Sequence, residues 1–386
     1  MRSLAVKSAI LVVAAGILLA IPVALILGNN GSKSATASLS KNTGQVGDDL
    51  NELRERQALR RGLDAPGTTP RPSATSTATG VAPAASGPAS TAVPTAAPTP
   101  RPTAAPTPRP TPPPTPAVVP AFSHVFVIVM ENHEYGSIIG SAAAPYTNSL
   151  ANTYGLATNY YGATHPSLPN YLALTAGSTF GITSDCTTCY VNATNIADQL
   201  EASGRSWKAY MEDMPSACYL GASSGNYAMK HNPFMYYNDI RNNAARCAAH
   251  VVPFSQFSGD MSSGQVPNFV WITPNMCNDT HDCAVSTGDA WLRGVVPTIT
   301  NSSAFRNGGV LFITYDEGSS NAGCCGTSSG GHVVTLVISP RSISGYRSGI
   351  AENHYGLLRT IEDAFRLAHL GGAASASNVA LKEYFH

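Results

Sequence analysis

Residues 124–134 read His-Val-Phe-Val-Ile-Val-Met-Glu-Asn-His-Glu, an apolar run that is followed at once by acidic and amide groups. Three later stretches have the same apolar character, at Asn268–Thr273, Val310–Thr314 and Val333–Ser339. Continuous apolar runs of this length are typical of strands that are buried on both faces. We therefore predict four buried strands, including one at His124–Met130.

Helix-like stretches lie between these strands, at Asn195–Ser203, Asp289–Thr300 and Tyr355–Ala368. Buried strands that alternate with helices indicate an α/β domain built on a mostly parallel sheet. Residues 121–386 carry all of this patterning and are long enough for one large domain. We assign the folded, catalytic part of the chain to this range.

The N-terminal end has a different composition. Residues 9–28 contain no charged residue and are rich in Leu, Ile, Val and Ala, a length that suffices to cross a bilayer as a helix. We predict a transmembrane anchor there, with residues 1–8 in the cytoplasm and the catalytic part outside the cell membrane. Ala35-Thr36-Ala37 offers a cleavage site, so a cleaved signal sequence and secretion are the alternative.

Two further segments separate the anchor from the folded part. Residues 29–63 form a polar juxtamembrane segment, and residues 64–120 hold 17 of the 28 prolines among many Ala and Thr residues. Such a composition cannot bury a core and favours extended polyproline II. We predict a disordered linker over residues 64–120.

Charge and cysteine content bound the function. Residues 121–386 hold 12 Lys and Arg against 18 Asp and Glu, a net charge of −6 that argues against nucleic-acid binding. All eight cysteines lie in this part, and an even number in an exported domain predicts disulfides. The candidate pairs are Cys218 with Cys247 and Cys277 with Cys283. Cys186 and Cys189 are further candidates, although these two together with Cys277 and Cys283 leave a zinc site as an alternative.

Polar side chains follow three of the predicted strands. Glu131 and Asn132 come directly after the first strand, Asn275 and Asp279 follow the second, and Asp316 and Glu317 follow the third. Open α/β sheets bind their ligands beyond the carboxyl ends of the strands, so these groups are expected to cluster. Their oxygens suit Mg, Mn or Ca, with Zn if a histidine joins them. We predict a divalent metal site here.

A second stretch supplies a nucleophile. His165-Pro166-Ser167-Leu168-Pro169-Asn170-Tyr171 is followed by apolar residues, and Pro169 suits the first turn of a helix. The free N–H groups and the positive dipole end at a helix start favour a phosphate. Ser167 is therefore an ordinary helix cap or a nucleophile. A metal beside it favours the nucleophile, because the metal would lower the pKa of the hydroxyl.

Further residues fit phosphoryl transfer, which needs cations on the phosphoryl oxygens and an acid for the leaving group. Lys230 and His231 are predicted to bind the phosphate, with Asn170 as a further contact. His281 or His332 is predicted to protonate the leaving group, and Asp279 and Asp282 lie beside His281 in the sequence as supporting groups.

Five stretches together resemble a known family, the bacterial and fungal phosphoesterases that include acid phosphatases and phosphatidylcholine-type phospholipases C, in the alkaline-phosphatase-like superfamily. The stretches are Val129–His133, His165–Tyr171, Ile272–Asn275 with Asp279–Asp282, Tyr315–Gly318 with His332, and His354–Asp363.

The resemblance implies a three-layer α/β/α fold and one metal ion held by Glu131, Asn132, Asp316 and Glu317. It implies a serine nucleophile near that metal. The Ser/Thr-hydrophobe-Pro-Asn pattern also resembles the nucleophile stretch of nucleotide pyrophosphatases in the same superfamily, which favours Ser167 over Thr164. Long phospholipase C members carry an Asp-His-Val-Pro-Pro run, of which only Gly331-His332-Val333 is present here. This difference favours the compact acid-phosphatase branch.

The expected function is thus hydrolysis of a small phosphorylated substrate by a phosphomonoesterase. Three alternatives stay open. The first is a phospholipase C or phosphodiesterase of the same family. The second is a serine hydrolase with its nucleophile in Gly221-Ala222-Ser223-Ser224-Gly225, which needs a strand before it and a helix after it. The third is an inactive, stalked surface-binding module.

Overall fold

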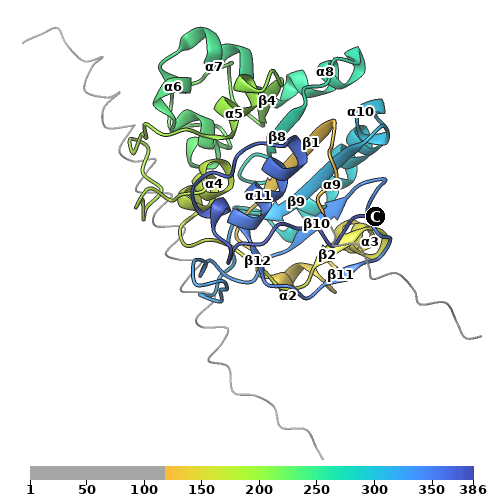
Figure 1. The fold of residues 1–386 in the computed structure, drawn as a ribbon. Coiled ribbons are helices and arrows are strands. Elements are labelled where there is room, and N and C mark those ends of the chain that lie inside the picture. The colour runs from red at the N-terminus through yellow and green to blue at the C-terminus, as the bar shows by residue number, and fades with distance from the viewer. Residues whose placement is uncertain (1–117) are drawn as a thin grey trace, which may run out of the picture. The chain divides into compact units, whose positions relative to one another are not determined.

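The computed structural model describes residues 118–386, so the predicted anchor at 9–28 and almost all of the predicted linker lie outside the described residues. Its main feature is an eight-stranded sheet with the order β11-β2-β10-β9-β1-β8-β4-β7 (Figure 1). The strands of this sheet are β1 (His124–Met130), β2 (Gly155–Ala157), β4 (Trp207–Met211), β7 (Val251–Pro253), β8 (Phe269–Thr273), β9 (Gly309–Tyr315), β10 (Thr335–Ile338) and β11 (Arg347–Ser348).

The sheet is mostly parallel, as predicted. β1 lies between β9 and β8 and is parallel to both, with Val125 opposite Val310 on one side and Phe269 on the other. β4 continues the parallel order beyond β8, and β7 continues it beyond β4. β10 runs antiparallel to its neighbours β9 and β2, which makes the sheet mixed.

The centre of the sheet forms the core. Every residue of β8, β9 and β10 is buried, so both faces of these strands are covered by other parts of the domain. The four strands predicted from apolar runs correspond to β1, β8, β9 and β10, and their bounds agree within two residues.

The most extensive helix–helix contacts join α4 with α11 and α3 with α9. The helices are α2 (Tyr135–Ile138), α3 (Pro145–Thr153), α4 (Ser167–Ala176), α5 (Ile196–Ala202), α6 (Asn238–Arg241), α7 (Ala244–His250), α8 (Phe257–Ser263), α9 (Val285–Thr300), α10 (Ser303–Arg306) and α11 (His354–Phe365), with 3-10 turns η1 (Met229–His231), η2 (Pro233–Met235), η3 (Phe254–Gln256) and η4 (Gly371–Ala374). The three predicted helices correspond to α5, α9 and α11. Over residues 118–386, no helix combines the length and apolar character that crossing a membrane requires.

The helix predicted to start at Ser167 does start there. In α4, Pro169 lies in the first turn, and Gly177 ends the helix in the left-handed conformation with φ +68°. A side chain at position 177 would clash with the Leu370 carbonyl, so the glycine is required both for the turn and for the close approach. The start of α4 is thereby fixed by proline and its end by glycine.

The cysteines of residues 118–386 are all paired. The structure joins Cys218 to Cys247 and Cys277 to Cys283, the two pairs expected from the sequence. It also joins Cys186 to Cys189 and the adjacent Cys324 to Cys325. Because Cys186 and Cys189 pair with each other, these four sulfurs do not form the zinc site that the sequence left open.

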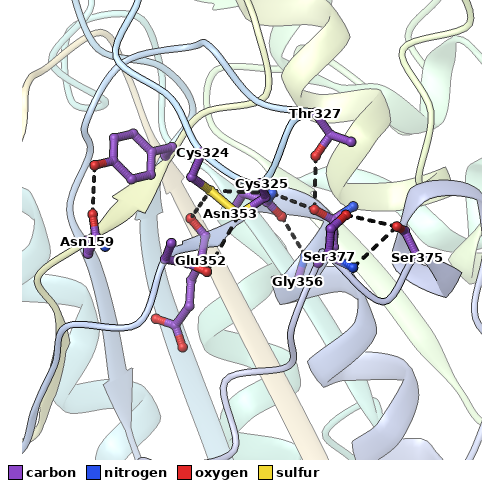
Figure 2. The surroundings of a disulfide bond; sticks show 12 residues. Asn159, Cys324, Cys325, Thr327, Glu352, Asn353, Gly356, Ser375 and Ser377 are labelled. Atoms are coloured by element: carbon purple, nitrogen blue, oxygen red, sulfur yellow. Dashed lines mark hydrogen bonds between the residues drawn. A yellow bond between two sulfur atoms is a disulfide. The ribbon is translucent and has the colours of Figure 1, made fainter.

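The adjacent pair packs against the start of α11 (Figure 2). The sulfur of Cys324 lies 3.6 Å from the Glu352 carbonyl oxygen, and the sulfur of Cys325 lies 3.6 Å from the Ala351 carbonyl oxygen. Asn353 caps α11 by accepting the Gly356 N–H at 3.0 Å. The loop between β9 and β10 is thus held against the N-terminus of α11, whose first residue, His354, contacts the Asp316 carbonyl.

Candidate active site

Three neighbouring parallel strands bring acidic side chains to one edge of the sheet. Glu131 follows β1, Asp316 follows β9, and Asp279 lies in the turn after β8. The backbone locks them together: the Glu131 N–H donates to the Asp279 carbonyl at 2.9 Å, and the Asp316 N–H donates to the Met130 carbonyl at 2.9 Å. All three side chains are buried. The predicted cluster at the strand ends is therefore present.

Ser167 faces this cluster from the first turn of α4. Its hydroxyl donates to Glu131 Oε2 at 3.1 Å and makes no capping bond to its own helix. The Ser167 side chain also acts to lower the pKa of the neighbouring Asp316 carboxyl, against the larger rise that burial causes. Of the two interpretations open from the sequence, the geometry fits a hydroxyl directed at the acidic cluster and not a helix cap.

His231 connects two of the acids. Its Nδ1 lies 3.2 Å from Asp279 Oδ2, and its Nε2 lies 3.4 Å from Glu131 Oε2. The ring stacks on Tyr171, whose hydroxyl donates to the other oxygen of Glu131. Glu131, His231 and Asp279 each offer one ligand atom, and these atoms lie within 4.8 Å of one another. This spacing is compatible with a shared metal ion.

Burial shapes the electrostatics of the cluster. It raises the pKa of Glu131 and of Asp279 well above the ordinary values, and the neighbouring Asp316 carboxylate raises both further. Burial also raises the pKa of Asp316 to about 6 and that of Glu317 to about 8. Burial, together with the nearby Lys230, lowers the pKa of His231 well below its usual value. The cluster thus concentrates carboxylates around a neutral imidazole.

The residues present fit a divalent cation. Asp316 Oδ2 and His231 Nε2 are buried and have no hydrogen-bond partner; the contact of Nε2 with Glu131 lacks hydrogen-bonding geometry. Buried polar atoms are normally satisfied, so these two atoms indicate a missing ligand. Carboxylate oxygens with one imidazole nitrogen are donors for Mg, Mn, Ca or Zn. A cation would also offset the carboxylate charge that burial disfavours.

Two of the predicted ligands lie beside this cluster. The backbone N–H of Asn132 donates to Asp316 Oδ1 at 3.1 Å, and Asn132 has a positive φ of 58°. Glu317 is buried and pairs with Nδ1 of His165, whose Nε2 lies 2.9 Å from the Ser320 carbonyl. His165 directly precedes the Ser167 turn, so Glu317 also ties that turn to the end of β9.

Lys230 and His281 form the cationic side of the site. Lys230 Nζ lies 3.2 Å from His281 Nε2 and 3.1 Å from Asp185 Oδ2. Nδ1 of His281 lies 2.7 Å from Asp282 Oδ1, and the His281 N–H donates to Asp279 Oδ1 at 2.8 Å. The hydrogen bond with His281 lowers the pKa of Asp282. The structure therefore brings Lys230, His231 and His281 together around the acids, with Asp279 and Asp282 touching the histidines.

Two predicted site residues have other surroundings. Asn170 accepts the N–H groups of Ala163 and Thr164, at 2.8 and 3.0 Å, and donates to the carbonyls of Thr164 and Pro166, at 2.8 and 3.0 Å. These bonds use all of its hydrogen-bonding groups, so its side chain orders the Ser167 turn and is not free to bind a phosphate.

His332 lies in the sequence between Glu317 and the start of β10. Its ring stacks on Tyr135 with 4.5 Å between the two ring centroids, and its Nε2 lies 3.1 Å from the Thr158 carbonyl oxygen. These contacts differ from those of His281, which touches Lys230 directly. Of the two histidines predicted to protonate the leaving group, the structure therefore favours His281.

The serine-hydrolase alternative lacks its structural context. Ser223 and Ser224 form β5, a two-residue strand paired with β6 (Tyr227–Ala228), and Ser223 is exposed. The nucleophile of that class lies between a buried strand and a helix. The Gly221–Gly225 stretch is a hairpin instead.

Sequence reasoning missed two residues of the site. Tyr171 lies four positions after Ser167, and residues four apart lie on the same face of a helix. If this stretch is a helix, Tyr171 is therefore expected to approach Glu131 together with Ser167. Asp185 comes from an irregular loop, and no periodicity marks it.

A profile of the Phosphoesterase family matches residues 141–368, more than half of the chain. The chain belongs to this phosphoesterase family. It is 34% identical over 259 residues to a phosphatidylinositol-3-phosphatase of Mycobacterium tuberculosis, covering 66% of this chain and 81% of that protein. It is 29% identical over 270 residues to an acid phosphatase of Aspergillus fumigatus, covering 67% of this chain and 58% of that protein. These relatives identify the phosphoesterase as a hydrolase of phosphoester bonds, similar to acid phosphatases.

Solved structures show more distant likenesses. An alkaline phosphatase superfamily protein from Vibrio parahaemolyticus has a TM-score of 0.47 at 12% identity, over 70% of this chain and 73% of that one. A phosphonate monoester hydrolase of Agrobacterium radiobacter has a TM-score of 0.45 at 12% identity, over 68% and 78% of the two chains. The family assignment rests on the sequence matches alone.

Proposed function

We propose that this phosphoesterase is a metal-dependent phosphomonoesterase that forms a phosphoserine at Ser167. The observation that carries the proposal is the contact of the Ser167 hydroxyl with Glu131 Oε2 at 3.1 Å, at the start of a helix and beside three buried acids. A hydroxyl at that place lies at the positive dipole end of α4, which favours the incoming phosphate.

The chain's own residues supply the remaining roles. Ser167 releases its proton to solvent and attacks phosphorus, Lys230 binds a non-bridging oxygen, and His281 gives a proton to the leaving alcohol as its bond to phosphorus breaks. Asp282 orients the His281 ring from the other nitrogen. Water then hydrolyses the phosphoserine and restores the hydroxyl. When bound, a divalent cation would lower the pKa of the serine hydroxyl and offset charge on the phosphoryl oxygens.

There are two candidate sets of metal-binding residues, and both include Glu131. The set implied by the family resemblance adds Asn132, Asp316 and Glu317, whereas the spacing in the structure also supports His231 and Asp279. The variants Asp316→Asn and Asp279→Asn distinguish the two sets. Replacing a carboxylate that binds the metal should weaken metal affinity far more than replacing a carboxylate that only lies nearby. Calorimetric titration of the metal-free variants with Mn²⁺ and Zn²⁺ measures the difference.

Substitution of the nucleophile tests the proposal. Ser167→Ala is expected to abolish phosphate release from p-nitrophenyl phosphate while the thermal unfolding midpoint stays close to that of the wild type. Thr164→Val is the matched control, because Thr164 carries the neighbouring hydroxyl, which donates to the His165 carbonyl at 3.4 Å. Full activity in Ser167→Ala, or loss of activity only in Thr164→Val, would reject Ser167 as the nucleophile.

The substrate class is a separate part of the proposal. Relative rates on a phosphomonoester, a phosphodiester and phosphatidylcholine distinguish a phosphomonoesterase from a phospholipase C or phosphodiesterase. An inactive surface-binding module is the remaining alternative, and it predicts no turnover with any divalent cation. All four proposed oxygen ligands are present in the chain, which supports an active enzyme.

We also propose that the sheet lies between two helix layers and that residues 9–28 anchor the enzyme with its catalytic domain outside the cytoplasm. Pairing of all cysteines within residues 118–386 supports an oxidising compartment. Protease treatment of intact cells tests the location: the catalytic domain should be cleaved from the surface. Protection until the cells are lysed would reject the outward orientation, and recovery in the medium would indicate secretion.

A further inference from the structure

Asp185 connects two parts of the site that come from different elements. It lies in the irregular loop between α4 and α5, directly before the disulfide from Cys186 to Cys189. Its Oδ1 accepts the Leu168 N–H at 2.9 Å, and its Oδ2 lies 3.1 Å from Lys230 Nζ. The side chain is only 10% exposed. One carboxylate therefore contacts both the Ser167 turn and the lysine.

On the lysine side, the contact fixes the direction of a cation. Lys230 Nζ lies between Asp185 Oδ2 and His281 Nε2, at 3.1 and 3.2 Å. An ammonium has three donors and no acceptor, so the Asp185 carboxylate accepts one of its hydrogen bonds. A lysine side chain has several rotatable bonds, and without the carboxylate its Nζ would sample other positions.

On the serine side, the contact fixes the first turn of α4. Leu168 follows Ser167, and its N–H is among those that a helix leaves without a partner. A carboxylate at this position satisfies the group and is favoured by the helix dipole. Since Lys230 belongs to η1 and Ser167 to α4, Asp185 sets the separation between the nucleophile and the cation.

We propose that Asp185 is a positioning residue of this enzyme, which holds the Lys230 ammonium in register with Ser167 so that both reach the same phosphoryl group. This inference rests on the proposed function. Small displacements of a positioned group cost about 10- to 100-fold in rate. Because Lys230 would bind charge that develops during transfer, the loss should appear in kcat and kcat/KM together.

Asp185→Asn is the main test variant, because it keeps the shape of the side chain and an oxygen for the Leu168 N–H but removes the charge that holds Lys230. It is expected to lower kcat for p-nitrophenyl phosphate by about 10- to 100-fold, with little change in KM. Asp185→Glu keeps the charge and is expected to recover part of the loss. Competitive inhibition by vanadate should weaken in parallel with kcat.

The matched control is Asp289→Asn. Asp289 caps α3 from another helix by accepting the N–H groups of Tyr146 and Thr147, at 3.0 and 2.7 Å, and it lies 3.6 Å from Arg293. It therefore combines a helix cap with a cation pair, and these contacts are made to α3 and within α9. Asp289→Asn is expected to lower the thermal unfolding midpoint and to leave kcat within about twofold of wild type.

A double-mutant cycle with Lys230→Met decides whether Asp185 acts through the lysine. In the Lys230→Met background, Asp185→Asn should cost little further activity. Wild-type kcat in Asp185→Asn, or equal losses from Asp185→Asn with and without Lys230, would overturn the proposal. If Asp185→Asn unfolds, Asp185→Glu in the same cycle gives the answer. Failure of the proposed function is distinct: the wild type would then show no turnover, or Ser167→Ala would retain it.

Discussion

At the scale of single residues, the site depends on side chains that hold Glu131 from both sides. The Tyr171 hydroxyl donates to Oε1, and the Ser167 hydroxyl donates to Oε2. A carboxylate that is oriented in this way is prepared to bind a cation without rearrangement. The tyrosine is therefore expected to matter through its hydrogen bond to Glu131.

Tyr171→Phe tests this role. Removing the hydroxyl should weaken metal affinity by about 10- to 100-fold, the usual effect of losing a partner of a metal ligand. The matched control is Tyr384→Phe, because the Tyr384 hydroxyl donates to buried Glu352 at 2.6 Å, a pair that belongs to a different part of the domain. Mn²⁺ titration should separate the two variants, and equal affinities would contradict the role of Tyr171.

The buried acids also predict how stability depends on pH. Burial raises the pKa of Asp316 to about 6 and that of Glu317 to about 8, above the values in an unfolded chain. At these two groups the folded state therefore binds more protons than the unfolded state between about pH 4 and pH 8. Stability falls with rising pH wherever this holds. The metal-free enzyme should lose stability from pH 5 to pH 8.

The control for this prediction is the metal-loaded enzyme. Glu352 and Glu362 also have pKa values of about 8 and contribute to the same slope in both forms. A bound cation replaces protons at the cluster alone, so it should flatten the slope and raise the unfolding midpoint most near pH 8. Parallel curves for the two forms would show that no cation binds at these acids.

At the scale of elements, the sequence predicted where the central strands end but not the direction of β10 or the presence of β4. The acids met at one edge because β9, β1 and β8 are adjacent and parallel, as continuous apolar runs indicate. The reversed direction of β10 cannot be inferred from hydrophobic pattern, which is identical for either direction. β4 was missed because Lys208 interrupts it; in the fold its ammonium lies 2.7 Å from Asp260.

The two disulfides expected from the sequence should differ in effect. Cys218 and Cys247 are 29 residues apart, whereas Cys277 and Cys283 are 6 apart and enclose His281. Loop entropy gives about 3.6 and about 2.2 kcal/mol for the two cross-links. Replacing the first pair by serines should lower the unfolding midpoint more, and replacing the second should lower kcat more. Equal kcat values in the two double variants would contradict a bracing role for Cys277 and Cys283.

At the scale of the whole molecule, the elements that form the core also position the residues of the site. Parallel strands bring Glu131, Asp279 and Asp316 to the same edge, and α4 brings Ser167 against them. The sequence could predict this much, because each acid follows an apolar run and each such run is a strand. It could not reveal Asp185, because a contact made by an irregular loop depends on packing that no local pattern records.

The most direct measurement of the central claim is mapping of the phosphorylated residue. The metal-loaded enzyme is mixed with p-nitrophenyl phosphate, quenched in acid within the first turnover, digested and analysed by mass spectrometry. Our account predicts phosphate on the peptide at Ser167, dependent on the divalent cation and absent from Ser167→Ala. Turnover without modification of Ser167, or with phosphate on another residue, would contradict it.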